Sequence, residues 1–319
     1  MDRTGRQDLR IAVLAGGTSD EREISLASGK NVVHALTEAG YGSVELIDPA
    51  APTFLERMTG DGWDAAFIAL HGIGGEDGRI QHVLEFLGIP YTASSPLASG
   101  IAMDKDLSKL LYRRAGLPVA PSVTFGHADM PPLEEIVAVV GEQSFVKPVV
   151  NGSSYGISLA KDPSELANAI EVAFEHGEKV MVEKRVFGTE CSVAAVGDGE
   201  TLRALPVVEI LVPEQSEFYD LEVKYADPKD LHRIPACLPG DVYTQVQEIA
   251  CRAHEALGLY GISRTDVIVT EDGPVILETN NIPGMTPESL VPDEARRAGI
   301  PFSELCAELV DLALKRAGR

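Results

Sequence analysis

The stretch that decides the fold is Arg264-Thr-Asp-Val-Ile-Val-Thr-Glu-Asp-Gly-Pro-Val-Ile-Leu-Glu-Thr-Asn280. It contains two apolar strand patterns joined by Glu-Asp-Gly, a good three-residue hairpin loop with glycine last. If the residues that flank this loop pair, Asp266 lies directly opposite Glu278. Asn280 then shares a face with Glu278, because side chains alternate along a strand with a period of two.

Two acidic side chains that face each other on a buried hairpin need a counter-charge. Like charges in directly opposite positions destabilise a sheet, and apolar residues on both faces, such as Val267 and Ile268, indicate burial. Oxygen ligands alone favour a hard cation, Mg²⁺ or Mn²⁺, rather than zinc. The alternative is an exposed hairpin with one edge pair of acids, and the residues alone leave both interpretations open.

The composition limits the classes of partner. The chain has 319 residues, with 27 Lys and Arg against 49 Asp and Glu, and a formal charge of −22. This length suggests two or three domains, and 45% hydrophobic with 24% charged residues is typical of globular proteins. The charge argues against binding nucleic acid or an anionic membrane. It does not exclude a small anionic ligand in a locally basic cleft.

The sequence shows no targeting or cross-linking pattern. The longest apolar runs, such as residues 65–70, are far below the roughly 18 residues that span a bilayer. The N-terminus shows no apolar region of a signal peptide. The four cysteines are scattered, with no Cys-x-x-Cys pair, so neither a disulfide framework nor a zinc site is expected. We therefore expect a protein of the reducing cytoplasm.

Strand and helix patterns alternate in the first part of the chain, which predicts a parallel βαβ sheet. Strands are expected there at 10–15, 43–47 and 65–70, with helices that end near Gly40 and span 77–87 and 104–115. The remainder is richer in strands, expected at 145–150, 156–160, 180–186, 192–196, 202–210, 264–269 and 275–278. The later helices are expected at 163–176, 241–257 and 301–317.

Several segments are candidate phosphate sites. Gly152-Ser-Ser-Tyr-Gly156 suits a loop whose N–H groups cover phosphates, although a plain hairpin turn is the commoner explanation. Lys105 opens a helix and Lys147 ends a strand, where a lysine is usually a solvated surface residue. Gly16-Gly-Thr-Ser-Asp20 lacks the third glycine of the dinucleotide fingerprint, which makes a nicotinamide-dependent enzyme a poor interpretation.

Glu21 and His71 each have a structural and a functional interpretation. Glu21 stands three residues after Thr18, the spacing of a helix capping box. His71 lies in a glycine-rich loop directly after a strand, the usual ligand position in an open α/β sheet. A lone histidine is more often structural, so the sequence leaves both residues open.

Taken together and in their order along the chain, these segments resemble the D-alanine–D-alanine ligases of the ATP-grasp superfamily over about residues 10–315. Examples are Met103-Asp-Lys105 and Glu278-Thr-Asn-Asn-Ile-Pro-Gly284. The stretches that carry the resemblance are 14–25, 69–78, 103–105, 146–148, 152–154, 182–184, 218–225, 264–266 and 278–290. Each alone could be chance, but their common order makes the resemblance specific.

The resemblance implies an α/β ATP-grasp fold with an N-terminal Rossmann-like parallel-sheet domain and three α/β domains around a central cleft. The domains would be an N-terminal substrate domain at 1–97, a central ATP-grasp domain at 98–186, and a C-terminal ATP-grasp and metal-binding domain at 187–319. The implied reaction joins two D-alanines with ATP through D-alanyl phosphate, for peptidoglycan precursor synthesis. ATP and two Mg²⁺ or Mn²⁺ ions would take part, in a homodimer.

The resemblance also implies a role for individual residues toward the nucleotide. The metal ligands would be Asp266, Glu278 and Asn280. The phosphate contacts would come from Lys105, Lys147, Ser153 and Ser154. The adenine and ribose would be bound by Glu183, Lys184, Val186 and Glu190.

Other residues are implied in binding and joining the amino acids. The first D-alanine would meet Glu21 and His71, and the second carboxylate would meet Ser289 and Leu290. The tetrahedral oxyanion would be stabilised by Arg264 and the backbone of Gly284. A closing loop would contribute Lys224 and Tyr225, the latter hydrogen-bonded with Ser153 and Glu21.

The sequence departs from the family pattern near the phosphate loop and the metal strand. Tyr155, Leu159 and Asn281 replace the usual valine, lysine and threonine. These changes spare the implied metal ligands, so we expect activity, but they leave nucleotide affinity and acceptor choice open. Tyr225 favours an amine acceptor over D-lactate, whereas D-serine and a non-catalytic nucleotide-binding paralogue remain as alternatives.

Overall fold

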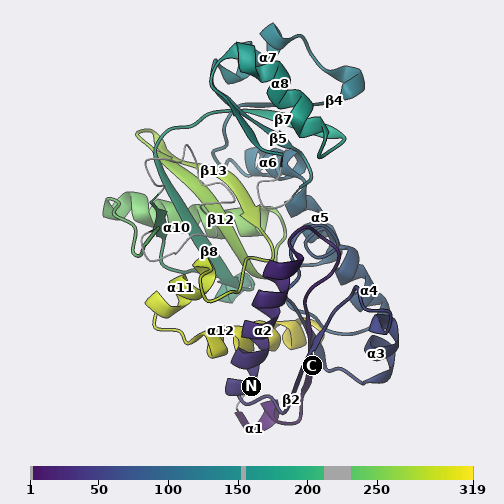
Figure 1. The fold of residues 1–319 in the computed structure, drawn as a ribbon. Helices are drawn as coiled ribbons and strands as arrows, with labels where there is room; N and C mark the ends of the chain where they lie inside the picture. The colour runs from purple at the N-terminus through teal and green to yellow at the C-terminus, as the bar shows by residue number, and fades with distance from the viewer. Residues whose placement is uncertain (1–2, 152–155, 212–230, 319) are drawn as a thin grey trace.

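The computed structural model describes residues 3–151, 156–211 and 231–318, which form three β-sheets with helices packed on them (Figure 1). The sheet from the first part of the chain lies at the bottom of Figure 1, and the four-stranded sheet lies at the top. Outside the described residues lie Ser153, Ser154, Tyr155, Lys224 and Tyr225.

The first sheet is parallel, and this prediction is confirmed. Its strand order is β2 (Ser43–Ile47), β1 (Arg10–Leu14), β3 (Ala65–Ile68). Alternate residues of β1 point to opposite faces, each with its own hydrophobic cluster. One face is covered by α2 (Arg22–Glu38) and α12 (Phe302–Arg316), and the other by α3 (Phe54–Gly60) and α4 (Arg79–Leu87). Burial on both faces explains why these strands are continuous apolar runs.

Helix α2 ends as its sequence predicts. Gly40 has φ +96°, in the left-handed region that glycine adopts without strain. This turn lets the Tyr41 N–H donate to the Leu36 carbonyl oxygen at 3.1 Å, which closes the helix and leads the chain into β2.

The four-stranded sheet is antiparallel and carries helices on one face only. Its order is β4 (Ser122–Gly126), β7 (Lys179–Lys184), β5 (Ser144–Pro148), β6 (Ser158–Ala160). Val146 and Val182 pack under α7 (Leu133–Val140) and α8 (Pro163–Phe174). Because side chains alternate, Lys147 and Glu183 point to the opposite face, toward the centre of the molecule.

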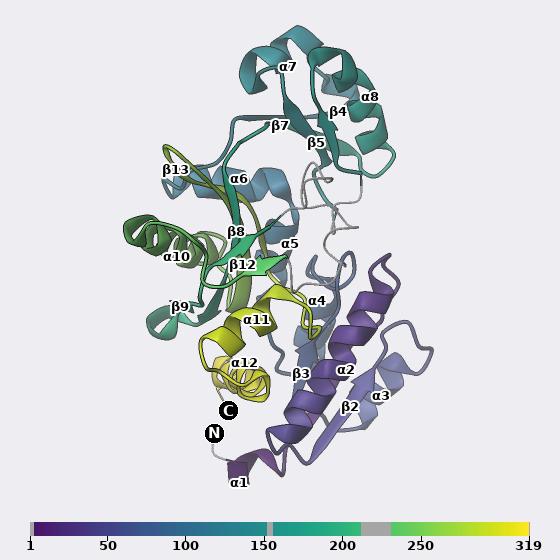
Figure 2. The ribbon, with the colours of Figure 1, turned by 60° about the vertical axis from the view of Figure 1, so that its left-hand side comes forward.

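The six-stranded sheet forms the centre of the protein (Figure 2). Its order is β11 (His232–Arg233), β10 (Val208–Ile210), β8 (Thr189–Gly197), β12 (Gly261–Thr270), β13 (Gly273–Asn280), with β9 (Arg203–Ala204) also on β8. One face packs on α5 (Pro96–Met103), α6 (Lys105–Arg114) and α10 (Gly240–Ala256), and the other on α11 (Leu290–Arg297) and α12. Helix α6 thus belongs to this core although it precedes the four-stranded sheet. The division at 97 and 186 stays a prediction.

The β12–β13 hairpin has the predicted pairing but a different turn. Asp266 does lie opposite Glu278. The loop is one residue shorter than predicted, because Thr270 pairs with Gly273. A β-bulge beside Asp266 takes up the offset with the extra residue Leu277, so the carboxylates still face each other.

Other departures from the predicted elements have local causes. The strand predicted at 202–210 is wrong, because it divides into β9 and β10 around Pro206, which has no N–H for a sheet. Helices α3, α5, α7 and α11 are not predicted, since each has only seven or eight residues and about two turns of periodic signal. Within the described ranges no helix is both long and apolar enough to cross a membrane.

Candidate functional site

A cavity of about 470 Å³ lies where the first sheet meets the six-stranded sheet. Its walls come from the start of α2, the loop after β3, the β12–β13 hairpin and the loop before α11. The predicted site residues on these walls are Glu21, His71, Arg264, Glu278, Asn280, Gly284, Ser289 and Leu290. Segments more than 250 residues apart in the sequence therefore meet in one cavity.

A second, smaller cavity of about 40 Å³ adjoins the first on the side of α6. Lys105, a predicted phosphate contact, lies on its wall. Glu278 and Asn280 line both cavities, as does Glu76. The predicted metal ligands of β13 thus stand at the junction of the predicted amino-acid site and the predicted phosphate site.

Asp266 is held at the centre of the sheet, since β12 lies between β8 and β13. It is 8% exposed, and its carboxylate accepts hydrogen bonds from Ser192 Oγ at 2.5 Å and from Arg264 Nε at 3.0 Å. Arg264 Nη2 lies 2.7 Å from the other oxygen. The alternative of an exposed hairpin with an edge pair of acids is therefore wrong for Asp266, and Arg264 supplies a positive charge at this site.

The donor set at the junction suits a hard cation. It consists of the carboxylates of Asp266 and Glu278, which pair across the hairpin, and the side-chain oxygen of Asn280. Among the residues that the structure describes, no group of three or more His, Cys, Asp or Glu side chains is arranged to hold a metal by itself. Any ion here would draw further oxygen ligands from substrate or water, as Mg²⁺ commonly does.

Glu21 occupies the N-cap position of α2 but does not cap it. No side-chain cap hydrogen bond is formed there, and Thr18 lies outside the helix. The Glu21 side chain is 6% exposed and lines the large cavity. The capping-box interpretation is therefore wrong, and a buried carboxylate faces the cavity.

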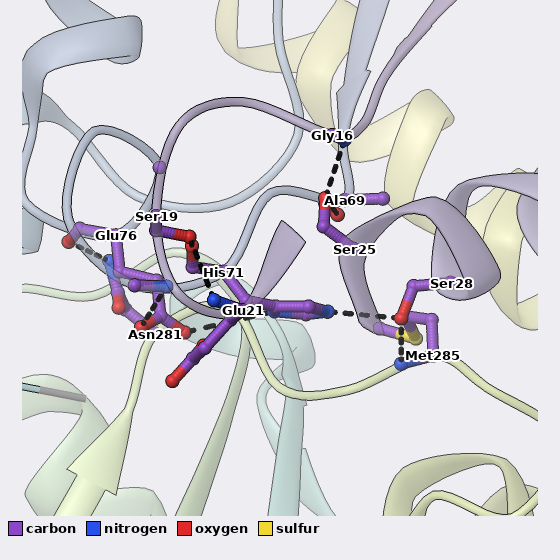
Figure 3. A network of polar contacts seen from close by, with 12 residues as sticks. Gly16, Ser19, Glu21, Ser25, Ser28, Ala69, His71, Glu76, Asn281 and Met285 are labelled. Carbon is purple, nitrogen blue, oxygen red and sulfur yellow. Dashed lines mark hydrogen bonds and ion pairs between the residues drawn. The ribbon is translucent and has the colours of Figure 1, made fainter. Parts of the chain in front are cut away.

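His71 is buried at the end of β3 and held by polar contacts, which Figure 3 shows. Its Nε2 atom lies 3.0 Å from Ser28 Oγ, and its Nδ1 atom lies 3.9 Å from a Glu76 oxygen. The Glu76 carboxylate also accepts from the Gly72 N–H at 3.0 Å, which fixes the glycine-rich loop. The ring borders the large cavity, so it is part of a built site as well as of the core.

Asn281 turns out to be a structural anchor. It is 3% exposed, and its Nδ2 donates to the Glu76 carbonyl oxygen at 3.0 Å. The residue that departs from the family pattern therefore ties the end of β13 to the loop after β3 (Figure 3).

Lys105 and Lys147 reach the site from different elements. Lys105 follows the N-cap Asp104 of α6 and donates from Nζ to the Asn151 carbonyl oxygen at 2.8 Å. Lys147 Nζ lies 2.5 Å from Glu183 Oε2. The interpretation of these lysines as solvated surface residues is therefore wrong, because both are at least half-buried.

Lys109 completes a buried triad that sequence reasoning missed. It is 2% exposed on α6 and pairs with the other oxygen of Glu183, itself 2% exposed. Burial disfavours the Glu183 charge, but Lys147 and Lys109 outweigh it and lower the pKa of Glu183. Burial outweighs Glu183 at Lys109 and lowers the pKa of Lys109, whereas Glu183 outweighs burial at Lys147 and raises the pKa of Lys147. The one feature of the sequence that could have pointed to Lys109 is its position, one helical turn after Lys105 on the same face of α6.

The remaining predicted nucleotide residues lie around the β7–β8 connection. Lys184 is exposed at the end of β7, and Val186 and Glu190 are half-buried. Glu190 and Glu278 both help to raise the pKa of Lys147, so the strand that carries Lys147 approaches the metal strand.

Comparison with known proteins agrees with this geometry. The family model for the D-ala D-ala ligase C-terminus matches residues 111–311. A D-alanine–D-alanine ligase from Syntrophobacter fumaroxidans is 43% identical over 311 residues, which cover 97% of this chain and 99% of that protein.

The chain belongs to the D-alanine–D-alanine ligase family.

Solved structures of the D-alanine–D-alanine ligase family have the same fold. The crystal structure of the ligase from Bacillus anthracis has a TM-score of 0.83 at 31% identity and covers 97% of this chain and 99% of that one. The same ligase in complex with ATP has a TM-score of 0.82 at 28% identity, covering 97% of this chain and 98% of that one. The ATP-grasp fold and the family resemblance are therefore confirmed. The roles of the individual site residues stay predictions.

Proposed function

We propose that this chain joins two D-alanine molecules to D-alanyl-D-alanine with ATP, through a D-alanyl phosphate. The observation that carries this proposal is the pair of cavities that share Glu278 and Asn280. An amino-acid site and a phosphate site that meet at carboxylates are what transfer of a phosphoryl group to a carboxylate requires. Membership of the ligase family supports the same reaction, and D-serine or D-lactate as the acceptor is not favoured.

The chemistry demands activation before the peptide bond forms. A carboxylate is a poor electrophile, so phosphorylation by ATP first provides a leaving group, and the second amine then displaces phosphate. No protein nucleophile is needed. Catalysis then depends on positioning and on neutralising charge at the transferred group.

The described residues suit these tasks. We propose that Glu21 binds the ammonium of the first D-alanine beside His71, and that Ser289 and Leu290 receive the second carboxylate at the start of α11. Arg264 and the Gly284 backbone line the same cavity, where positive charge and an N–H can stabilise the tetrahedral oxyanion.

On the nucleotide side, the proposed phosphate contacts are the ammonium groups of Lys105 and Lys147. Asp266, Glu278 and Asn280 would hold Mg²⁺ or Mn²⁺, since carboxylate oxygens and a side-chain amide oxygen are the ligands that these hard ions prefer. Such ions would neutralise phosphate charge. Two ions, a homodimer, the cytoplasm and a role in peptidoglycan synthesis stay predictions.

The test is phosphate release from ATP with D-alanine, D-serine or D-lactate, with identification of the product. We expect ATP turnover that depends on D-alanine and yields the dipeptide. Glu278→Gln should lower kcat at least roughly tenfold, the effect of losing about 1.4 kcal/mol of transition-state stabilisation. Glu271→Gln, an exposed acid at the tip of the same hairpin, is the matched control and should retain activity. Absence of ATP turnover with every D-amino acid would refute the proposed function.

A further inference from the structure

Two side chains of helix α2 form hydrogen bonds with both backbone polar groups of Met285, in the loop after β13. The Met285 N–H donates to Ser28 Oγ at 3.3 Å, and Asn31 Nδ2 donates to the Met285 carbonyl oxygen at 2.7 Å. Ser28 and Asn31 are three residues apart and thus lie on one face of the helix. Because the Met285 N–H lies in the same peptide unit as the Gly284 carbonyl group, its hydrogen bond to Ser28 fixes the Gly284–Met285 peptide plane, which directly follows the Gly284 N–H in the chain.

The same serine hydroxyl also holds the ring of His71. Ser28 is fully buried, and its Oγ lies 3.0 Å from His71 Nε2 (Figure 3). A hydroxyl has one hydrogen to donate and two lone pairs to accept. Since Oγ accepts from the Met285 N–H, its own hydrogen can go to Nε2. A neutral His71 then carries its proton on Nδ1, on the side of Glu76.

The loop that carries Gly284 is held at its other end as well. Asn281 donates to the Glu76 carbonyl oxygen, and Ile282 packs into the core of the first sheet. The segment from Asn281 to Met285 is therefore attached to the N-terminal part of the molecule at both ends. Helix α2 also presents Glu21 at its start. One rigid helix thus sets the relative positions of groups for the first amino acid and for the oxyanion.

We propose that Ser28 is a positioning residue of the ligation reaction. Its hydroxyl aligns the His71 ring with the first D-alanine and, through Met285, aligns the Gly284 backbone with the oxyanion. This inference rests on the proposed function, because it takes the roles of His71 and Gly284 from there. Ser28 itself lines neither cavity.

Kinetics of the full chain test the inference. We expect Ser28→Ala to raise KM for the first D-alanine and to lower kcat, each roughly tenfold, since one hydroxyl serves two buried contacts. KM for ATP should stay within about twofold, because no contact of Ser28 reaches the second cavity. Asn31→Ala removes only the Met285 arm and should lower kcat with little change in KM for D-alanine.

Ser25→Ala is the matched control. Ser25 lies on the same helix, is equally buried, and also makes two hydrogen bonds, from the Gly16 N–H and to the Ala69 carbonyl oxygen. It contacts neither His71 nor Met285 (Figure 3). Suppose that Ser28→Ala and Ser25→Ala lose stability equally and that neither changes the ratio of KM for D-alanine to KM for ATP. Ser28 then has only a structural role, and the inference is wrong.

A second measurement judges the inference without catalysis. The ¹⁵N chemical shifts of the His71 ring, assigned with a His71→Gln variant, report which ring nitrogen carries the proton. We expect the Nδ1–H form in the native chain and a mixture of both forms in Ser28→Ala. Unchanged shifts would overturn the inference. A native chain that turns over no ATP would instead refute the proposed function.

Discussion

Replacing Lys109 with methionine tests whether the buried triad serves ATP binding. In the native chain, Lys109 takes one oxygen of Glu183 and Lys147 takes the other, the latter at 2.5 Å. Methionine preserves most of the apolar stem but removes the charge. The full charge of Glu183 then falls on Lys147, which is held more firmly to the carboxylate and withdrawn from the phosphates.

The magnitudes follow from the burial of the triad. Removing one partner of a buried ion pair costs about 3–5 kcal/mol, and the lower end is expected because Lys147 remains with Glu183. Withdrawing Lys147 from ATP removes one charge-assisted hydrogen bond, about 1.5–3 kcal/mol. KM for ATP should therefore rise roughly 10- to 150-fold. KM for D-alanine should change little, since Lys109 does not line the large cavity.

The assay is phosphate release at saturating D-alanine with varied ATP, together with thermal unfolding of each variant. Lys109→Arg keeps the charge and should retain most of the affinity. Lys179→Met makes the same chemical change at an exposed position on β7 and should leave both measurements unchanged. A Lys109→Met chain that is less stable yet binds ATP normally would show that the triad only supports the fold.

Three further predictions concern stability. Burial lowers the pKa of His254 from 6.5 to about 4. The unfolded chain therefore takes up this proton first as the pH falls, and up to about 3 kcal/mol of stability is lost between pH 6.5 and 4; in His254→Gln, pH-dependent unfolding should lack this part of the loss, and identical curves would contradict it. Burial raises the pKa of Glu294 well above 4.5, so its folded form favours the proton and stability falls as the pH rises; Glu294→Gln should melt higher than the native chain at pH 8 but not at pH 4, and a lower melting temperature at pH 8 would refute this. Arg316 lies 4.4 Å from the ring of Tyr91 and 4.9 Å from that of Tyr260 and donates two hydrogen bonds to backbone carbonyl oxygens; Arg316→Met should cost about 2–3 kcal/mol in denaturant unfolding, and an unchanged midpoint would contradict the argument.

Local patterns in the sequence predict the parts of the fold whose cause is local. The parallel strands appear as apolar runs because both faces are buried, and Gly40 marks the end of α2 because the turn there needs a positive φ. The facing acids of the β12–β13 hairpin could be predicted because β pairing repeats every two residues. The turn itself could not, since the bulge beside Asp266 offsets a loop one residue shorter than the pattern suggests.

The parts of the site that sequence reasoning missed depend on distant contacts. In the sequence, Lys109 looks like an ordinary lysine on a helix surface. It is buried against Glu183 only because α6 packs between two sheets. Ser28 and Asn31 have no motif at all. Their function arises because the loop after β13 crosses α2, more than 250 residues away in the chain.

This difference has a consequence for how the chain tolerates substitution. Strand-borne groups such as Asp266 and Glu278 are positioned by backbone pairing, so a neighbouring side chain can change without moving them. Met285 is positioned by two side chains of another element, and Asn281 by its own side chain. The position of the loop that carries Gly284 therefore depends on which side chains stand at residues 28, 31 and 281. A threonine at residue 281 would be too short to make the same amide contact with Glu76, so the position of this loop depends on the length of the Asn281 side chain.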